Sequence, residues 1–298
     1  MDIKRPLTYK DQVQRLIEHN MVISDKENAA RILSEVNYYR FSGYALEFRD
    51  KDHPDDYIKG TTFEDVWHRY QFDSKLRSVL KPYLDTLEVY ARSQIAYGFA
   101  MSKCQDPPYD QHYDPNNFFL KESHADIIVS SLGREKENSK NELFVIHHTD
   151  KYEGKMPLWV IVELLSFTNL SKFYSAMYQS EQDIIAQIFF TSGQTLRNHL
   201  HCLANLRNKV AHAGRLYNMT FNPPIKLGNS YLQKNPDIKP NTLFAYLIAL
   251  IRRLHKRIDR LALITAIVDV TALYSDSIQL SLLGIPANYV KILCNEIH

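Results

Sequence analysis

An arginine and a histidine, Arg207 and His212, stand five residues apart in the polar stretch NLRNKVAHAGRLYN (205–218), near the end of a predicted helix. The planar guanidinium of arginine matches phosphate oxygens, and imidazole transfers protons near neutral pH. Together such groups could cleave RNA without a metal. A histidine would take the proton of the ribose 2′-OH or give one to the leaving 5′-oxygen, while an arginine would offset charge on the phosphorane. Alone, an Arg-x4-His pattern is a weak signal, because many helices contain it by chance.

The helix that carries this pair is expected to begin near Thr195 and to have two distinct faces. At about 100° per residue, three leucines and Val210 share one arc. The opposite arc carries amide and imidazole groups: Asn198, His201, Asn205, Asn208 and His212. This stripe suits a groove for a polar ligand, so His201 and Asn205 are candidates for an auxiliary role. A polar seam between packed helices explains the stripe equally well.

Arg207 does not share the polar face. It projects toward the apolar arc, about 140° from His212 by the same helical arithmetic. An arginine in that position needs a carboxylate, carbonyl groups or a bound anion, because an unpaired buried charge is costly. Two arrangements would bring an arginine and a histidine of the motif together. The helix could loosen before Gly214 and swing His212 round, or motif residues of two chains could line one cleft.

Glu88 and Arg92 lie four residues apart on a long predicted helix. This spacing predicts an ordinary i,i+4 ion pair. The alternative is that one of the two orients Arg207 or contacts RNA. Arg215 follows the motif and either adds a phosphate contact or complements the carbonyl groups at the helix end.

A second basic group occurs in IRRLHKRIDR (251–260), where Arg252, Lys256 and Arg260 follow at i, i+4 and i+8. On one continuous helix these residues would form a ridge that could track the phosphate backbone of RNA. A solvated helix face is the default interpretation. Near the N-terminus, the aromatic residues around Arg40 (Tyr38, Tyr39 and Tyr44) could stack on unpaired bases, although packing of a helical pair is favoured.

The composition is that of a globular protein, with 45% hydrophobic and 23% charged residues. The formal charge of +2 means that nucleic-acid contact would have to come from a local patch. The three cysteines, Cys104, Cys202 and Cys294, are far apart, which argues against a disulfide framework and for a reducing compartment. His199 and His201 lie just before Cys202, but the two histidines point to different helix faces. We therefore expect neither a metal nor another cofactor.

The chain also lacks the signals of several other classes. Its N-terminus has no apolar signal segment, and the longest apolar run, near 261–270, is too short to cross a bilayer. These features predict a cytoplasmic protein without membrane contact. No Gly-rich phosphate loop, nucleophile elbow or HExxH motif occurs in the sequence, so kinase, P-loop, α/β-hydrolase and zincin functions are excluded.

The elements that must position these residues are predicted to be helices. Few stretches alternate strictly and only nine glycines occur, so strands have little support. Oxygen caps three residues before an acid mark three helix starts: Thr8, Ser24 and Thr62. A long helix is expected over 63–100, or two helices meeting at Pro82, and 105–117 and 221–241 are expected to be loops. Further helices are predicted at about 121–150, 157–178, 181–190, from 195 and after 241.

Five segments together resemble the Abi-like family, which are bacterial phage-abortive-infection proteins of the AbiD/AbiF type. They occur in the family's order and span roughly residues 5–220: 33–49, 69–80, 87–100, 157–177 and 206–218. The resemblance implies membership of the HEPN superfamily of helical bundles, many of which are metal-independent ribonucleases acting as homodimers. Its R-x(4–6)-H signature falls on Arg207 and His212, with Asn208 as the polar residue after the arginine. Related motifs often have a second histidine where this chain has Ala213.

The resemblance thus favours the two-chain arrangement, in which motif residues of a homodimer line one cleft. The predicted fold is all-α: a HEPN-like bundle (61–220) with extra N-terminal (1–60) and C-terminal (221–298) helices. The predicted function is an endoribonuclease toxin of a phage-defence system, restrained by a protein or non-coding RNA antagonist. The alternatives are a non-catalytic module that binds RNA or protein, and a DNA-binding regulator.

Overall fold

A computed structural model describes residues 5–119 and 122–297. Within these residues the regular elements are α-helices and short 3-10 helices, and two isolated bridges join loops (Val22 to Thr62 and Arg49 to Tyr57). The predicted all-α fold is confirmed. None of the described helices combines the length and apolar character needed to cross a membrane.

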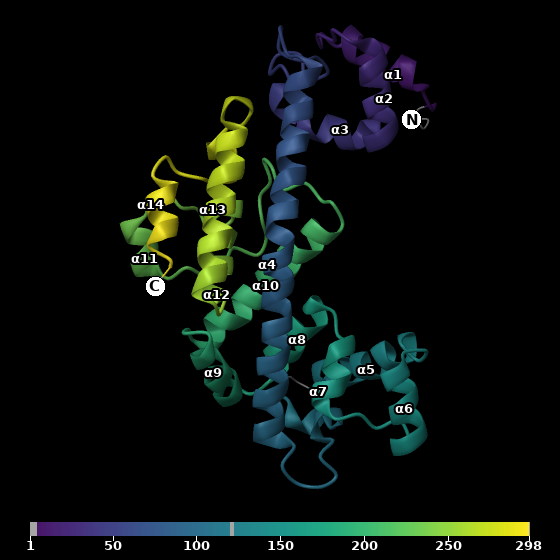
Figure 1. The fold of residues 1–298 in the computed structure, drawn as a ribbon, viewed down its shortest axis with the longest axis vertical. Coiled ribbons are helices and arrows are strands. Elements are labelled where there is room, and N and C mark those ends of the chain that lie inside the picture. Colours follow the sequence, from purple (N-terminus) through teal and green to yellow (C-terminus); the bar gives the residue numbers. More distant parts are fainter. Residues whose placement is uncertain (1–4, 120–121, 298) are drawn as a thin grey trace.

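The long helix α4 (Phe63–Lys103) is the axis of the molecule (Figure 1). It begins at the predicted capping box, in which the Thr62 hydroxyl accepts from the backbone of Asp65 and the Asp65 carboxylate accepts in return. Its 41 residues correspond to about 60 Å. Pro82 lies inside α4 without ending it, so the single-helix alternative is the one observed.

The N-terminal helices lie together at the first end of α4 (Figure 1). They are α1 (Tyr9–Glu18), α2 (Lys26–Val36), α3 (Tyr38–Tyr44) and the 3-10 helix η1 (Leu46–Phe48). The capping box of Thr8 and Asp11 is present at α1 as predicted. The predicted cap Ser24 is wrong, because the Asp25 carboxylate accepts from the backbone of Asn28 and starts α2 one residue later.

Shorter helices follow at the far end of α4. They are η2 (Gln111–Tyr113), η3 (Pro115–Asn117), α5 (Glu122–Asn138), α6 (Leu143–Tyr152), α7 (Leu158–Ile161), η4 (Val162–Leu164) and α8 (Phe167–Ala176). The helix predicted at 121–150 is two helices separated at 139–142, and its residue 121 lies outside the described residues. The helix predicted at 157–178 is also interrupted, because Ser166 leaves the helical conformation and caps α8.

The remaining helices build the middle of the molecule. They are α9 (Gln179–Ile188), α10 (Gly193–Ala211), α11 (Asn229–Lys234), α12 (Leu243–Arg253), α13 (Arg257–Leu273), η5 (Ser275–Ser277), η6 (Leu280–Leu283) and α14 (Tyr289–Cys294). The predicted loop 221–241 therefore contains one short helix, α11. Helix α12 is buried on all sides from Leu243 to Ile251, and α10 packs against α4, α8, α9 and α12. The division at 60/61 and 220/221 stays a prediction.

Candidate functional site

The motif helix ends inside the motif. His212 is the C-cap of α10, Ala213 adopts a left-handed conformation (φ 52°), and the chain reverses at Gly214. The Gly214 N–H donates to the Lys209 carbonyl at 2.6 Å, and a Cβ at Gly214 would lie 3.1 Å from that oxygen, so a side chain there would be crowded. His212 is exposed and has left the helical arc from which its angle to Arg207 was calculated.

Arg207 has the carboxylate partner that its position on the helix demands. Its Nε lies 2.9 Å from Oε2 of Glu88 and 3.9 Å from Oδ1 of Asp85, both on α4. The Glu88 side chain is 7% exposed and that of Arg207 is 32% exposed. Neither Arg207 Nε nor Glu88 Oε2 has a hydrogen-bond partner among the described residues, so their attraction is one of charge. The guanidinium is thus held at the protein surface by a buried acid.

The same acid binds a second arginine. Arg92 Nη2 donates to Oε1 of Glu88 at 2.9 Å and to the Leu165 carbonyl at 2.9 Å, and Arg92 Nη1 lies 3.7 Å from the more exposed Glu163. The predicted i,i+4 pair is therefore present, but it is largely buried. Because Glu88 lies between Arg92 and Arg207, it carries one negative charge between two positive ones.

The polar stripe of α10 is in part a seam between elements. Asn208 Nδ2 donates to the Thr168 hydroxyl of α8 at 3.0 Å. Asn198 donates to the Pro224 carbonyl and accepts from the Lys226 backbone, which ties down the loop after the motif. His201 is exposed, and Asn205 is half-buried. Two members of the stripe therefore serve packing, while His201 and His212 face solvent.

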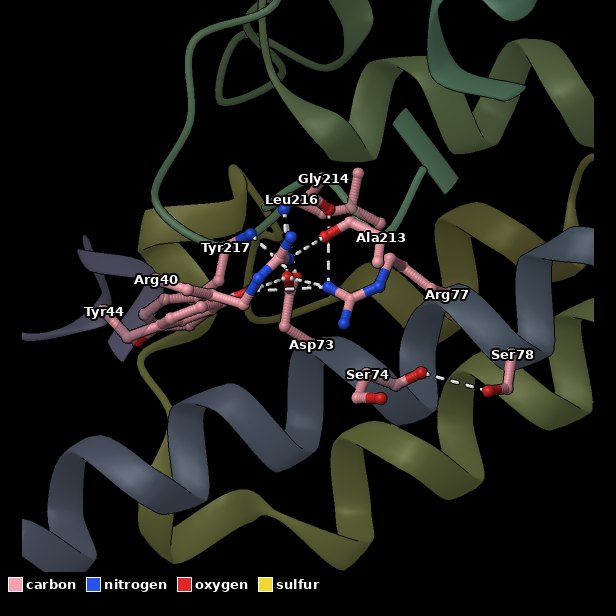
Figure 2. A network of polar contacts seen from close by, with 10 residues as sticks. All are labelled: Arg40, Tyr44, Asp73, Ser74, Arg77, Ser78, Ala213, Gly214, Leu216 and Tyr217. Carbon is pink, nitrogen blue, oxygen red and sulfur yellow. Dashed lines mark hydrogen bonds and ion pairs between the residues drawn. The ribbon is translucent and has the colours of Figure 1, made fainter. Parts of the chain in front are cut away.

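A buried carboxylate anchors the segment that follows His212. Asp73, fully buried on α4, accepts from the backbone N–H groups of Leu216 (3.1 Å) and Tyr217 (2.9 Å), as Figure 2 shows. The Tyr44 hydroxyl donates to it at 2.6 Å and Arg77 at 2.5 Å. Burial raises the pKa of the Asp73 carboxyl, and these donors oppose that shift by stabilising the charged form.

Two more arginines join the motif turn to the N-terminal helices. Arg40 of α3 donates to the Ala213 carbonyl, and Arg215 donates to the Gly43 carbonyl of α3 (Figure 2 shows the Arg40 contact). Arg215 is therefore engaged in positioning the turn, and its predicted phosphate contact stays a prediction. Tyr39, 86% exposed, borders a cavity of about 410 Å³ beside this turn.

The sequence pattern does not predict that Asp73 and Arg77 belong to the site, and for Tyr44 and Arg40 it suggests only base stacking or packing. A signal was available in α4: Arg69, Asp73 and Arg77 recur at four-residue spacing within its buried stripe. Charged residues in register with apolar ones must find buried partners. Tyr44 is buried and meets Tyr70 edge to face at 5.5 Å between ring centroids, so the favoured packing role is confirmed for it.

The predicted basic ridge at 251–260 is wrong as a helical surface. Helix α12 ends at Arg253 and α13 begins at Arg257, so Lys256 is the N-cap of a new helix. Arg252 forms a bidentate pair with Glu296 at 2.6 and 3.0 Å, and Arg260 Nε donates to the Leu254 carbonyl. The i, i+4, i+8 spacing does not form a ridge because the chain turns between Arg253 and Arg257.

The histidines and the cysteine within α10 have separate environments. His199 is buried, its Nε2 lies 2.6 Å from the Lys226 carbonyl, and burial lowers its pKa to about 3. Burial raises the pKa of the Cys202 thiol to about 11. Across the described residues no group of three His, Cys, Asp or Glu side chains could hold a metal ion.

The chain was compared with protein-family models, curated proteins and solved structures. A family model described as "Abi-like protein" matches residues 31–218, which include α4, the Asp73 anchor and the whole motif. No curated protein and no solved structure matches the chain.

Proposed function

The chain belongs to the Abi-like protein family, which indicates a role in abortive infection, and from this premise we propose that it is a metal-independent endoribonuclease of the HEPN type. One observation carries the proposal. Arg207 is held by the buried Glu88 with a third of its side chain exposed, and His212 is exposed just beyond the helix end. A phosphate clamp and a proton-transfer group thus both reach solvent.

In the proposed reaction the ribose 2′-oxygen attacks the adjacent phosphorus, the 2′-O–P bond forms and the P–O5′ bond breaks. Either His212 takes the 2′-OH proton while water protonates the leaving 5′-oxygen, or His212 protonates that oxygen while water takes the 2′-OH proton. Arg207 offsets the charge on the phosphorane. Asn208 positions the end of α10 through its hydrogen bond to Thr168. The products are a 2′,3′-cyclic phosphate and a 5′-hydroxyl.

Purified protein and a long single-stranded RNA test this proposal. His212→Ala should lower cleavage by about 100-fold or more, the typical contribution of general acid–base catalysis. His68→Ala is the matched control, because His68 is another exposed histidine, on α4. The 5′ ends of the fragments should accept phosphate from a polynucleotide kinase without prior dephosphorylation. Equal cleavage by wild type and His212→Ala would refute the assignment.

We also propose that the active form is a homodimer, with Arg207 of one chain and His212 of the other at each cleft. Mixing inactive Arg207→Ala and His212→Ala chains tests this arrangement. If the cleft is composite, half the dimers are mixed and one of their two clefts is intact, so about a quarter of the activity returns. If each chain holds a complete site, mixing restores nothing.

A non-catalytic RNA- or protein-binding module is the second candidate. The observation in its favour is that Glu88 and Asp85 already oppose the charge of Arg207, which weakens a phosphate clamp. For such a module, His212→Ala would leave toxicity in growing cells unchanged, whereas the nuclease proposal expects the variant to be harmless.

The proposed function also implies a cellular location, an antagonist and further RNA contacts. RNA substrates place the activity in the cytoplasm, and a toxin of this kind needs an antagonist, either a protein or a non-coding RNA. RNA contacts are proposed for Lys256, which is exposed, and for the half-exposed Arg215 and Arg260. Arg252 is the weakest candidate because Glu296 neutralises it.

A further inference from the structure

A second cavity lies away from the motif, between the first half of α10, the turn from α12 to α13 and the C-terminal segment. Its volume is about 800 Å³. Five lysine and arginine side chains line it: Lys226, Arg252, Arg253, Arg257 and Arg260. The one acidic residue in the described lining, Glu296, is already paired with Arg252. The cavity therefore has an excess of positive charge and the size of a small-ligand pocket.

Arg253 is the most unusual residue of this cavity. It is 6% exposed, it donates to the Phe189 carbonyl, and its Nε has no hydrogen-bond partner among the described residues. No described carboxylate lies within 4.0 Å of its nitrogens. Burial and the charges of Arg252 and Arg260 lower the pKa of Arg253 to about 10. A buried cation among cations is costly without an anion to neutralise it.

Two further features indicate what kind of anion would fit. The first turn of α13 opens at Arg257, and within the described chain no side chain caps it, so its N–H groups favour negative charge. Phe190, 85% exposed, also lines the cavity. An exposed aromatic ring beside a cationic pocket can stack on a nucleobase.

We propose that this cavity binds a free nucleotide, with its phosphates at Arg253, Arg257 and the start of α13 and its base on Phe190. The site is separate from the motif, because His199, which lines the cavity, precedes His212 by thirteen residues, or about 20 Å along α10. The proposal does not depend on RNA cleavage.

Calorimetric titration of the full-length chain with ATP and with inorganic triphosphate tests the site. Wild type should bind both. Arg257→Gln, a change of an exposed side chain, should weaken both ligands about tenfold, the effect expected for one charged contact. Arg31→Gln is the matched control, because Arg31 is an exposed arginine on α2 and should leave both affinities unchanged.

A second variant separates base from phosphate. Phe190→Ala should weaken ATP about tenfold and leave inorganic triphosphate unchanged, because only the base meets the ring. Arg253→Gln should abolish binding of both ligands and also raise the melting temperature or leave it unchanged, because a buried unneutralised charge is removed. The His212→Ala chain should bind like wild type, which keeps this test apart from the nuclease proposal.

Three results would overturn the proposal. Wild type would fail to bind ATP at millimolar concentration, or the affinities would be the same in Arg257→Gln, Arg253→Gln and the control. The third is binding of a short RNA oligomer that depends on these arginines when ATP and triphosphate do not bind, which would make the cavity part of an RNA path instead of a nucleotide site.

Discussion

The two ends of α10 give its histidines opposite properties. His199, in the first half, is buried against the Lys226 carbonyl and has its pKa lowered to about 3 by burial. It stays neutral at cellular pH and serves packing. His212, at the other end, is exposed on a turn that leaves the helix. Of the two, only His212 is exposed to solvent.

The supporting contacts differ in the same way. Near His199, carbonyl and amide groups of one loop close over the helix, through Asn198 and the backbone of Lys226. Near His212, Asp73 accepts hydrogen bonds from the backbone N–H groups of Leu216 and Tyr217, while the His212 side chain stays exposed. The lesson is that a side chain can be exposed and still well placed if its neighbours in sequence are anchored to the core.

The largest effect is expected when the Asp73 anchor near the C-terminal end of α10 is removed. Asp73→Ala leaves Tyr44, Arg77 and two backbone N–H groups without their acceptor, so the free energy of unfolding should fall by about 3–5 kcal/mol. Chemical denaturation measures it. Asp269→Ala, an exposed aspartate on α13, should cost less than about 0.5 kcal/mol. If both variants are equally stable, Asp73 is not the anchor.

The next effect is the pH dependence of the stability that the buried His199 contributes. The folded pKa of His199, about 3, lies below its ordinary value of 6.5, so protonation favours the unfolded chain. The stability that His199 contributes is complete above pH 6.5 and is lost as the pH falls toward 3. At pH 5 the loss is about 2 kcal/mol relative to pH 7. His112, whose pKa burial lowers to about 4, adds a similar loss.

Denaturant unfolding at both pH values measures this loss. His199→Gln should reduce the difference between pH 7 and pH 5 by about 2 kcal/mol, while the exposed His201→Gln should leave the difference as in wild type. An unchanged difference in His199→Gln would mean that its imidazole is protonated as readily in the folded chain as in the unfolded one.

A smaller effect sharpens the role of Glu88 at the motif end. Glu88→Gln removes the charge that holds Arg207, and RNA cleavage should fall about tenfold, mainly in kcat, if the guanidinium acts in the transition state. Glu163→Gln is the control, because Glu163 is exposed and lies 3.7 Å from Arg92. Stronger RNA binding by Glu88→Gln without any cleavage would favour the non-catalytic module, since Glu88 would then mask Arg207.

The smallest effect compares the two caps of α10. The Ser192 hydroxyl accepts from the Thr195 backbone at 3.3 Å and caps the first turn. Ser192→Ala should cost about 1 kcal/mol of stability, and Ser192→Asp should keep it. His212→Ala at the other cap should cost less than about 0.5 kcal/mol, because the side chain is exposed. A large loss in His212→Ala would give His212 a structural role.

Much of the fold was predictable because its signals are local. The capping boxes at Thr8 and Thr62 and the periodicity of α4 specify helix starts and a buried face within a few residues. Predictions failed where a helix is interrupted inside a helical pattern, at 139–142, at Ser166 and between Arg253 and Arg257. There, packing against other elements overrides local preference.

The candidate site was predictable in its residue types but not in its connections. The sequence analysis named Glu88 and Arg92 beside Arg207 and predicted that Arg207 needs a partner. It could not connect Asp73 to the motif turn, because a carboxylate on a helix can meet any of many backbone donors. It also predicts Arg252, Lys256 and Arg260 on one continuous helix, whereas a turn between Arg253 and Arg257 ends that helix; Arg252 and Arg260 then line one cavity that does not include Lys256.

Short-range pattern, then, specifies that the chain is helical, where several helices begin and that a guanidinium and an imidazole stand near the end of one of them. Tertiary packing alone decides that Glu88 meets Arg207, that Asp73 holds the turn after His212, and that basic residues surround a cavity. The reason is distance along the chain: Asp73 and Leu216 are 143 residues apart. Contacts of that separation depend on how whole helices pack, which local periodicity does not encode.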